Sequence, residues 1–357
     1  MSHIERHITL CWLMLCLSIA GLCGCASDNA EVEDAANAVY YWRQELRLTD
    51  AERDWLRRHE VRKMYVHLFD VERRPDGSLR PRMTLDVTDA VPAGIKVIPV
   101  VFLTPDMMRD TTGLSALPTL IARRVQDMMT QNDLGPLDEL QLDFDWARSN
   151  QQRYFGLLTA MRQSLSEVTG HDVRLSATIR LHQLQMQAPP VDYGALMVYN
   201  VGRLQQYDED CSILRRSLVE PYLRNLRGYK LPLCAALPVY DWDLLFHGQE
   251  FCRIVRGIDV TDTTDFVRID TLPGQRYMAR RYMPIPVTGV SMRGDGRIYP
   301  GDMIRHEAVS ADELQAVLQA LAKERPAMCR QVILYHLDEK QLKKYSDEDI
   351  QRIYVGR

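Results

Sequence analysis

Short apolar runs alternate with helix-like stretches along most of the chain, and this alternation limits the possible folds more than any other feature of the sequence. Eight runs have the length and apolar character of buried strands. They cover residues 38–44, 61–71, 95–103, 139–150, 173–184, 193–202, 231–246 and 330–339. The stretch at 151–170 is typical of those between them, because its apolar residues have helical spacing and it ends in a glycine.

Strands that alternate with helices indicate a parallel sheet with right-handed crossovers. Eight such units can close on themselves, so we expect an α/β fold of the (β/α)8 TIM-barrel type. A doubly wound open sheet is the alternative. That fold more often has a glycine-rich turn after its first strand, and the segment YYWRQELRLTD (40–50) contains no glycine.

The connection between the seventh and eighth runs is far longer than connections usually are. It is rich in Arg, Tyr, Pro and Gly, as in QRYMARRYMPIPVTGVSMRGDGRIYPGD (275–302). We therefore expect a small α+β insertion at about residues 247–328. Its one expected helix, 310–324, opens like a capping box, with Ser310 followed three residues later by Glu313.

The N-terminus has the features of a secretion signal. Arg6 and His7 precede an apolar run at 8–22, which suits a signal-peptide core and is short for a membrane span. The run ends in LCGC, which resembles a bacterial lipobox. On this interpretation residues 1–24 are removed and Cys25 becomes the lipidated first residue. Cys23 fits less well because Leu22 precedes it, and an ordinary cleaved signal is the alternative.

The residues after this cysteine are polar and acidic, as in a flexible tether, which we place at 25–37. The barrel domain then spans 38–357. A lipid anchor at Cys25 predicts a protein of the bacterial cell envelope, attached to the outer membrane.

Composition excludes some classes of function. The net charge of −4 gives no reason to expect a nucleic-acid partner. Four cysteines follow the tether, with no CxxC spacing, so we expect no zinc site: Cys211, Cys234, Cys252 and Cys329. The spacing of His67, His182 and His336 does not require that they converge on a metal. We expect no cofactor.

Polar and aromatic residues gather late in the predicted strands, where a TIM barrel has its active site. The predicted ligand-binding residues are Arg43, His67, Trp146, Arg180, His182, Tyr199, Asn200, Tyr240, Trp242 and Tyr335. The carboxylates at these strand ends are Asp70, Asp143, Asp145, Asp241 and Asp243. Aromatic rings mixed with carboxylates and amides suit a carbohydrate, whose ring faces stack on aromatics while its hydroxyls take hydrogen bonds.

Asp143 and Asp145 are two residues apart in a strand-like run, so both are expected to face the barrel interior. Structural alternatives exist for each group. Asp145 can cap the following helix, Arg180 can pair with Asp143 inside the barrel, and Tyr240 and Trp242 can belong to the core. We expect the two carboxylates to be functional together.

The segment LQLDFDWA (140–147) resembles the fourth-strand signature Asp-x-x-Asp-x-Asp-x-Glu of the chitinase and endo-N-acetylglucosaminidase superfamily of barrel glycoside hydrolases. Asp143 and Asp145 match the second and third Asp, and Trp146 matches a Trp common before the acid. MVYN (197–200) resembles the sixth-strand Met-x-Tyr-Asp/Asn of that family, which often carries an insertion after its seventh strand.

The chain departs from that signature at two positions. Leu140 replaces the first Asp, and Ala147 replaces the Glu that in the family protonates the leaving oxygen. The resemblance implies that Asp145 and Tyr199 hold an acetamido group, but without general-acid catalysis, a loss that costs typically about 10²–10⁴-fold. Either the barrel binds glycans without that chemistry, or Asp241 or Asp243 supplies the proton in a two-carboxylate hydrolysis. The candidate catalytic residues are therefore Asp143, Asp145 and Asp241. A structural or assembly lipoprotein is the third hypothesis.

Overall fold

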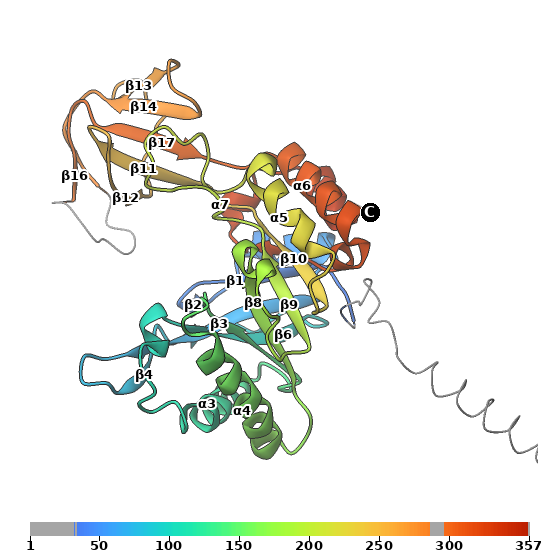
Figure 1. The fold of residues 1–357 in the computed structure, drawn as a ribbon. Coiled ribbons are helices and arrows are strands. Elements are labelled where there is room, and N and C mark those ends of the chain that lie inside the picture. The colour runs from blue at the N-terminus through green and yellow to red at the C-terminus, as the bar shows by residue number, and fades with distance from the viewer. Residues whose placement is uncertain (1–31, 33, 286–295, 356–357) are drawn as a thin grey trace, which may run out of the picture.

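The computed structural model describes residues 32, 34–285 and 296–355, and Figure 1 shows a barrel with a smaller sheet beside it. Eight parallel strands form the barrel: β1 (Ala38–Tyr41), β3 (Lys63–Arg73), β6 (Lys96–Leu103), β7 (Glu139–Asp143), β8 (Arg174–Arg180), β9 (Tyr193–Met197), β10 (Leu233–Pro238) and β18 (Val332–Tyr335). Neighbours in this order pair in parallel, and β1 pairs with both β3 and β18, which closes the barrel. The TIM-barrel prediction is confirmed, and the open-sheet alternative is wrong.

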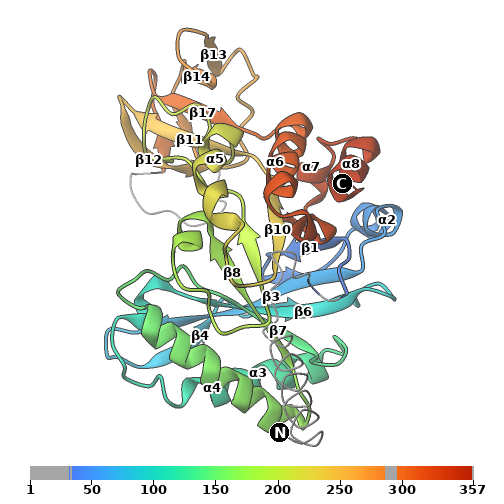
Figure 2. The same ribbon diagram turned by 45° about the vertical axis from the view of Figure 1, so that its right-hand side comes forward.

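Helices cover the barrel from outside, as Figure 2 shows for α3 and α4 on one flank. The helices are α2 (Asp50–Arg58), α3 (Leu117–Gln131), α4 (Gln151–Thr169), α5 (Arg216–Leu226), α6 (Ala311–Glu324), α7 (Glu339–Leu342) and α8 (Asp347–Val355). Two crossovers lack an α-helix. The one from β3 to β6 holds strands β4 (Leu79–Arg82) and β5 (Asp86–Val87), and the one from β8 to β9 holds the 3-10 helix η3 (Leu181–Gln185).

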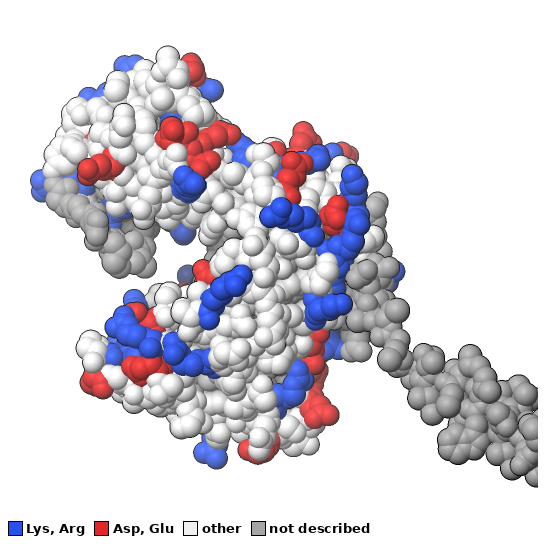
Figure 3. Space-filling view, in the orientation of Figure 1, with Lys and Arg blue, Asp and Glu red and all other residues white. Residues whose placement is uncertain are grey.

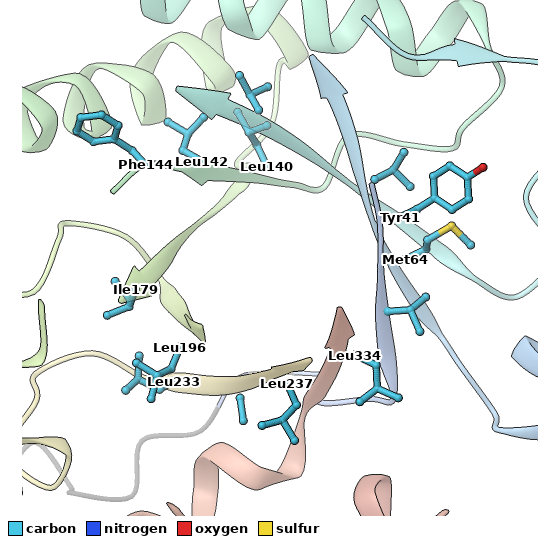
Figure 4. Packing of buried hydrophobic residues seen from close by; sticks show 14 of the residues in the cluster. Tyr41, Met64, Leu140, Leu142, Phe144, Ile179, Leu196, Leu233, Leu237 and Leu334 are labelled. Carbon is cyan, nitrogen blue, oxygen red and sulfur yellow. The ribbon is translucent and has the colours of Figure 1, made fainter. Parts of the chain in front are cut away.

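The main core lies between the barrel strands and these helices. Leu140, Leu142, Ile179 and Leu334 point outward from their strands and are fully buried (Figure 4). Burial of each such side chain stabilises the fold by about 1.5–3 kcal/mol. Helices cover the outward face of the strands, so apolar residues recur along each strand even where polar residues face the interior. This explains why the eight strands were visible in the sequence.

The barrel interior is polar at the N-terminal ends of the strands, a region that we call the floor. Its side chains, none of which is more than 5% exposed, are Lys63, Tyr65, Glu139, Ser176, Tyr193 and Gln331. Ser176 and Tyr193 donate to Glu139, while Lys63 and Tyr65 contact Gln331 at 3.0 and 2.8 Å. Val32 belongs to the same interior cluster and is also buried.

A five-stranded antiparallel sheet, which we call the inserted sheet, lies between β10 and β18. Its order is β12 (Glu250–Val255), β11 (Trp242–His247), β17 (Met303–Glu307), β14 (Gln275–Ala279) and β13 (Phe266–Ile269). The predicted seventh run is therefore two strands, because β10 ends at Pro238 and β11 begins at Trp242. A short ribbon, β15 (Met283–Pro284) with β16 (Arg297–Ile298), lies beside it.

The predicted helix of this segment forms as α6, capped by Ser310. It packs against α5 and α8, and Leu314, Val317 and Leu318 join the main core of the barrel. We therefore assign α6 to the ring of barrel helices, so the predicted insertion limit near 328 lies too far along the chain.

The predicted signal peptide 1–24 and Cys25 lie outside the described residues. Within the described part of the chain, no helix combines the length and apolar character needed to cross a membrane.

Candidate functional site

The candidate site lies where the C-terminal ends of the barrel strands open, a region that we call the mouth. Figure 3 shows the molecule hollowed between the inserted sheet and the part of the barrel that carries β3 and β4. The chain passes from β10 into the inserted sheet through β11 and returns from β17 to α6. The inserted sheet is therefore attached at the mouth and forms one side of this hollow.

A row of rings, which we call the aromatic arc, follows the mouth from β3 to β11. Successive ring centroids are 4.4 Å apart for His67–Trp42, 5.9 Å for Trp42–Tyr335, 5.0 Å for Tyr335–Tyr199, 6.3 Å for Tyr199–Tyr240 and 5.4 Å for Tyr240–Trp242. All but His67 keep part of their surface exposed. Five of these rings come from different strand ends, so the barrel closure itself assembles the arc.

The tyrosines of the arc remain hydrogen-bond donors at neutral pH. Burial raises the pKa of Tyr199 and of Tyr240 well above the usual value for a phenol. The hydroxyl of Tyr240 donates to Oδ1 of Asn200 at 2.6 Å, and Asn200 has a φ of 54°, which Asn tolerates better than most residues. Tyr199, Asn200, Tyr240, Trp242 and Tyr335 therefore come together as neighbours.

A charged corner formed by β7 and β8 adds polar groups to the mouth. Oδ1 of Asp143 accepts hydrogen bonds from Thr178 Oγ1 at 2.6 Å and from Arg180 Nη2 at 3.0 Å. Burial works against the charge on Arg180, but the adjacent Asp143 carboxylate raises its pKa. The expected pairing of Arg180 with Asp143 therefore forms.

Asp145 differs from Asp143 in its surroundings. β7 ends at Asp143, and Asp145 lies beyond it in a loop with 55% of its side chain exposed, against 7% for Asp143. Its carboxylate is 3.4 Å from Nε2 of Gln183 and 3.7 Å from Nε2 of the exposed His182. We expected both carboxylates to lie in one strand and face the barrel interior. This holds for Asp143, but β7 ends there and Asp145 belongs to the exposed loop that follows.

Two predicted ligand-binding residues serve the fold instead. Trp146 is fully buried against Phe155, with ring centroids 5.3 Å apart, so it cannot contact a ligand. Arg43 points away from the barrel axis, over the ring of Tyr41, and pairs with the buried Glu52 of α2. The sequence showed that these residues follow strands. It did not show whether their side chains face the mouth or the packed helices.

Each of the remaining carboxylates of the mouth contacts a basic side chain. Asp241 pairs with Lys344 and accepts from Gln341, and Asp243 lies 2.8 Å from Nδ1 of His306. Asp70 lies 2.8 Å from Nε2 of His67. Sequence reasoning missed Thr178 and Gln183, although they lie in the fifth predicted run beside Arg180 and His182. It also missed His306 and Lys344, which lie far from the motifs.

No group of His, Cys, Asp and Glu side chains able to hold a metal ion occurs in the described part of the chain. His67, His182 and His336 each have separate partners or surroundings: Asp70 for His67, Asp145 for His182 and the ring of Tyr335 for His336. The four described cysteines are free thiols.

Comparison with solved structures places this barrel beside those of glycan hydrolases. An N-acetylglucosaminidase of glycoside hydrolase family 18 from Paenibacillus barengoltzii matches 91% of this chain and 100% of that chain, at TM-score 0.52 and 12% identity. A chitinase from Chromobacterium violaceum matches at TM-score 0.51 and 11% identity, over 90% of this chain and 98% of that one. The Bacillus cereus spore cortex-lytic enzyme SleL matches at TM-score 0.50 and 13% identity, over 90% and 74%.

No family model matches the sequence, and the comparison with curated proteins found no relative. The architecture is a closed eight-stranded parallel barrel whose strand ends carry the candidate site. The chain has the fold of the chitinase-like superfamily of TIM-barrel glycoside hydrolases.

Proposed function

We propose that the mouth of this barrel binds glycans that contain N-acetylglucosamine, and that it does not cleave them by the acid-assisted mechanism of the family it resembles. The proposal rests on two observations together. The aromatic arc lines the mouth, and Ala147 occupies the position that the catalytic acid has in the family that the chain resembles. Ala147 is exposed in the loop after β7, and its backbone N–H donates to Asn150. A methyl group there offers no proton.

The contacts of the mouth carboxylates support binding without turnover. Two-carboxylate hydrolysis needs one carboxyl group that donates a proton and another that attacks or activates water. Asp143, Asp241 and Asp243 are each in contact with a basic side chain, namely Arg180, Lys344 and His306, so none of the three is a free carboxyl group. Asp145 alone is largely exposed and loosely held.

Structural neighbours support the choice of ligand class. One is a plant class V chitinase from Cycas revoluta in complex with (GlcNAc)3, which matches at TM-score 0.50 and 8% identity over 90% of this chain and 99% of that chain. In the present chain the partly exposed rings of Tyr240 and Trp242 offer stacking surfaces, and the tyrosine hydroxyls offer hydrogen bonds to sugar hydroxyls.

Hydrolysis with Asp145 as the essential carboxylate is the alternative. The observation that favours it is the distance of 3.7 Å between the Asp145 carboxylate and Nε2 of His182, both of them open to solvent. On that account Asp145→Asn abolishes turnover while binding persists. A structural or assembly lipoprotein, the third hypothesis, has no ligand at the mouth.

Calorimetry with N-acetylglucosamine oligomers tests the proposal. We expect binding by the wild type, and a loss of at least about 10-fold in affinity for Trp242→Ala, because stacking and a ring-sized apolar contact are removed. Tyr282→Ala is the matched control, since Tyr282 is an exposed aromatic residue that directly precedes β15 and lies outside the aromatic arc. Equal affinity in both variants, or no binding by the wild type, contradicts the proposal.

We further propose that the protein is anchored in the bacterial envelope by lipid on Cys25, with the outer membrane as its location. Support comes from the LCGC segment behind an apolar run. Cys25→Ser should move the protein from the membrane fraction to the soluble fraction, because acyl chains supply the stable attachment. Cys23→Ser is the matched control and should remain with membranes. A Cys25→Ser protein that stays in the membrane fraction contradicts the lipobox interpretation.

A further inference from the structure

The aromatic arc ends at Trp242, and a buried glutamate of the inserted sheet holds that ring. Trp242 and Glu307 are paired across β11 and β17. The indole Nε1–H of Trp242 donates to Oε2 of Glu307 at 2.8 Å. Glu307 is 1% exposed, so this hydrogen bond to a charged acceptor is shielded from water and correspondingly strong.

The same carboxylate oxygen also holds the connection from β9 to α5. Oε2 of Glu307 accepts from the backbone N–H of Ser212 at 2.9 Å and from the Ser212 hydroxyl at 2.7 Å. Tyr199 and Asn200, two residues of the mouth, lie near the start of this connection. Val201 and Gly202 in turn donate to the carbonyl oxygens of Ile213 and Ser212, so the start of the connection is tied to the part that Glu307 holds.

Two buried arginines of the inserted sheet fix the middle of the connection. Arg305 is fully buried, pairs with Glu307 at 2.5 Å, and donates to the carbonyl oxygens of Leu204 and Gln206 at 3.0 and 2.6 Å. Arg276 is also fully buried and donates to the carbonyl oxygen of Glu209 at 2.6 Å. The segment 203–212 is therefore bound by side chains of β14 and β17.

Stability alone does not account for these buried charges. Taking a guanidinium or a carboxylate out of water costs several kcal/mol, and apolar side chains of similar volume usually give equal or greater stability. What apolar side chains cannot provide is a fixed acceptor for Trp242 and Ser212 together. The buried carboxylate fixes the orientation of both partners relative to the barrel.

We infer that Glu307 is a positioning residue for glycan binding, which sets the orientation of Trp242 and, through Ser212, of the β9–α5 connection that carries Tyr199 and Asn200. This inference rests on the proposed function, because it assumes that the ligand contacts the arc. It assigns the inserted sheet a direct part in the site, since its buried Arg305 and Glu307 hold two sides of the mouth.

The experiment combines binding with the indole NMR signal of Trp242, which is identified by its loss in Trp242→Phe. Glu307→Gln keeps an acceptor oxygen but loses the charge. We expect it to move the Trp242 indole N–H signal and the Ser212 amide signal, and to weaken oligosaccharide affinity about 5-fold. Glu250→Gln, on β12 of the same sheet and exposed, is the matched control and should leave the indole signal and the affinity unchanged.

A double-mutant cycle shows whether Glu307 acts through the ring. In the Trp242→Phe background, which has no indole donor, Glu307→Gln should cost clearly less than the 5-fold seen in the wild type, and the loss that remains is the part that Ser212 carries. A full 5-fold loss in that background, or an unmoved indole signal in the single variant, overturns the inference. If the wild type binds no glycan, the proposed function fails, and the indole and Ser212 signals still decide whether Glu307 positions both groups.

Discussion

The floor and the mouth of the barrel use the same kinds of side chain for different ends. Both contain tyrosines, a carboxyl group on β7 and a basic side chain. These are Glu139 and Lys63 at the floor, and Asp143 and Arg180, which pair with each other, at the mouth. At the floor these groups are sealed from solvent, with Val32 packed in the same cluster. At the mouth the rings remain partly exposed, and Asp145 is open to solvent.

This contrast separates stability from binding. Among the described residues, every buried polar side-chain atom of the floor has a hydrogen-bond partner. At the mouth, Arg180 Nη1 and His336 Nδ1 are buried without a hydrogen-bond partner. Burial raises the pKa of Glu139 and lowers that of Lys63, so the floor favours the uncharged form of each group. We conclude that the floor supports the fold, whereas the mouth carries the partly exposed rings on which the proposed function depends.

The largest expected effect is at the floor. Glu139→Ala leaves the hydroxyls of Ser176 and Tyr193 without their acceptor in a sealed interior. We expect the free energy of unfolding to fall by about 3 kcal/mol, measured by denaturant titration. Asp145→Ala, at the other end of the same run, should change it by less than about 0.5 kcal/mol because that carboxylate is exposed. Similar losses in the two variants would break the comparison.

The next effect concerns pH and the mouth. Burial lowers the pKa of His336 to about 4, whereas an unfolded chain has a histidine pKa near 6.5. The unfolded state therefore takes up a proton first as the pH falls, and stability is lost between about pH 7 and pH 4.

This contribution should amount to about 2 kcal/mol, because His336 keeps some exposure. Denaturant titrations at pH 7 and pH 4.5 should show a smaller loss for His336→Gln than for the wild type. The exposed His171→Gln serves as control and should follow the wild type. An unchanged pH dependence in His336→Gln would refute the assignment.

The smallest effect is one hydrogen bond in the arc. Tyr240→Phe removes the hydroxyl that donates to Asn200 at 2.6 Å but keeps the ring. We expect glycan affinity to fall about 3- to 10-fold, in line with about 1 kcal/mol for such a bond, with little change in stability. Calorimetry measures the affinity. An unchanged affinity would remove Asn200 and the Tyr240 hydroxyl from the site and reduce the mouth to its stacking surfaces.

The barrel was predictable from the sequence because the helix-covered face of each strand must be apolar, and the eight apolar runs that result recur along the chain. The sequence did not predict where each strand ends. β7 ends at Asp143, so Asp145 lies in the following loop, and Trp146 is buried in the core rather than open to the mouth. The helix-free crossovers beside β4 and η3 were missed as well, because tertiary packing rather than local pattern decides whether a connection is helical.

Site residues were predictable only where they belong to strand-end motifs. Tyr199, Tyr240, Trp242 and Tyr335 follow apolar runs, so barrel closure brings them together. Glu307 and His306 belong to β17, whose five residues carry no motif. Their contact with Trp242 and Asp243 depends on the register of the inserted sheet, which the sequence does not state.

The measurement that tests the central claim most directly is reducing-end release from N-acetylglucosamine oligomers and from a panel of bacterial and host glycans, run beside calorimetry on the same samples. Our account predicts that the wild type binds at least one of these glycans and releases no product from it. It also allows Ala147→Glu, which restores a carboxyl group at the acid's position, to gain weak activity. Product release by the wild type that Asp145→Asn abolishes while binding persists would contradict the account and establish a hydrolase instead.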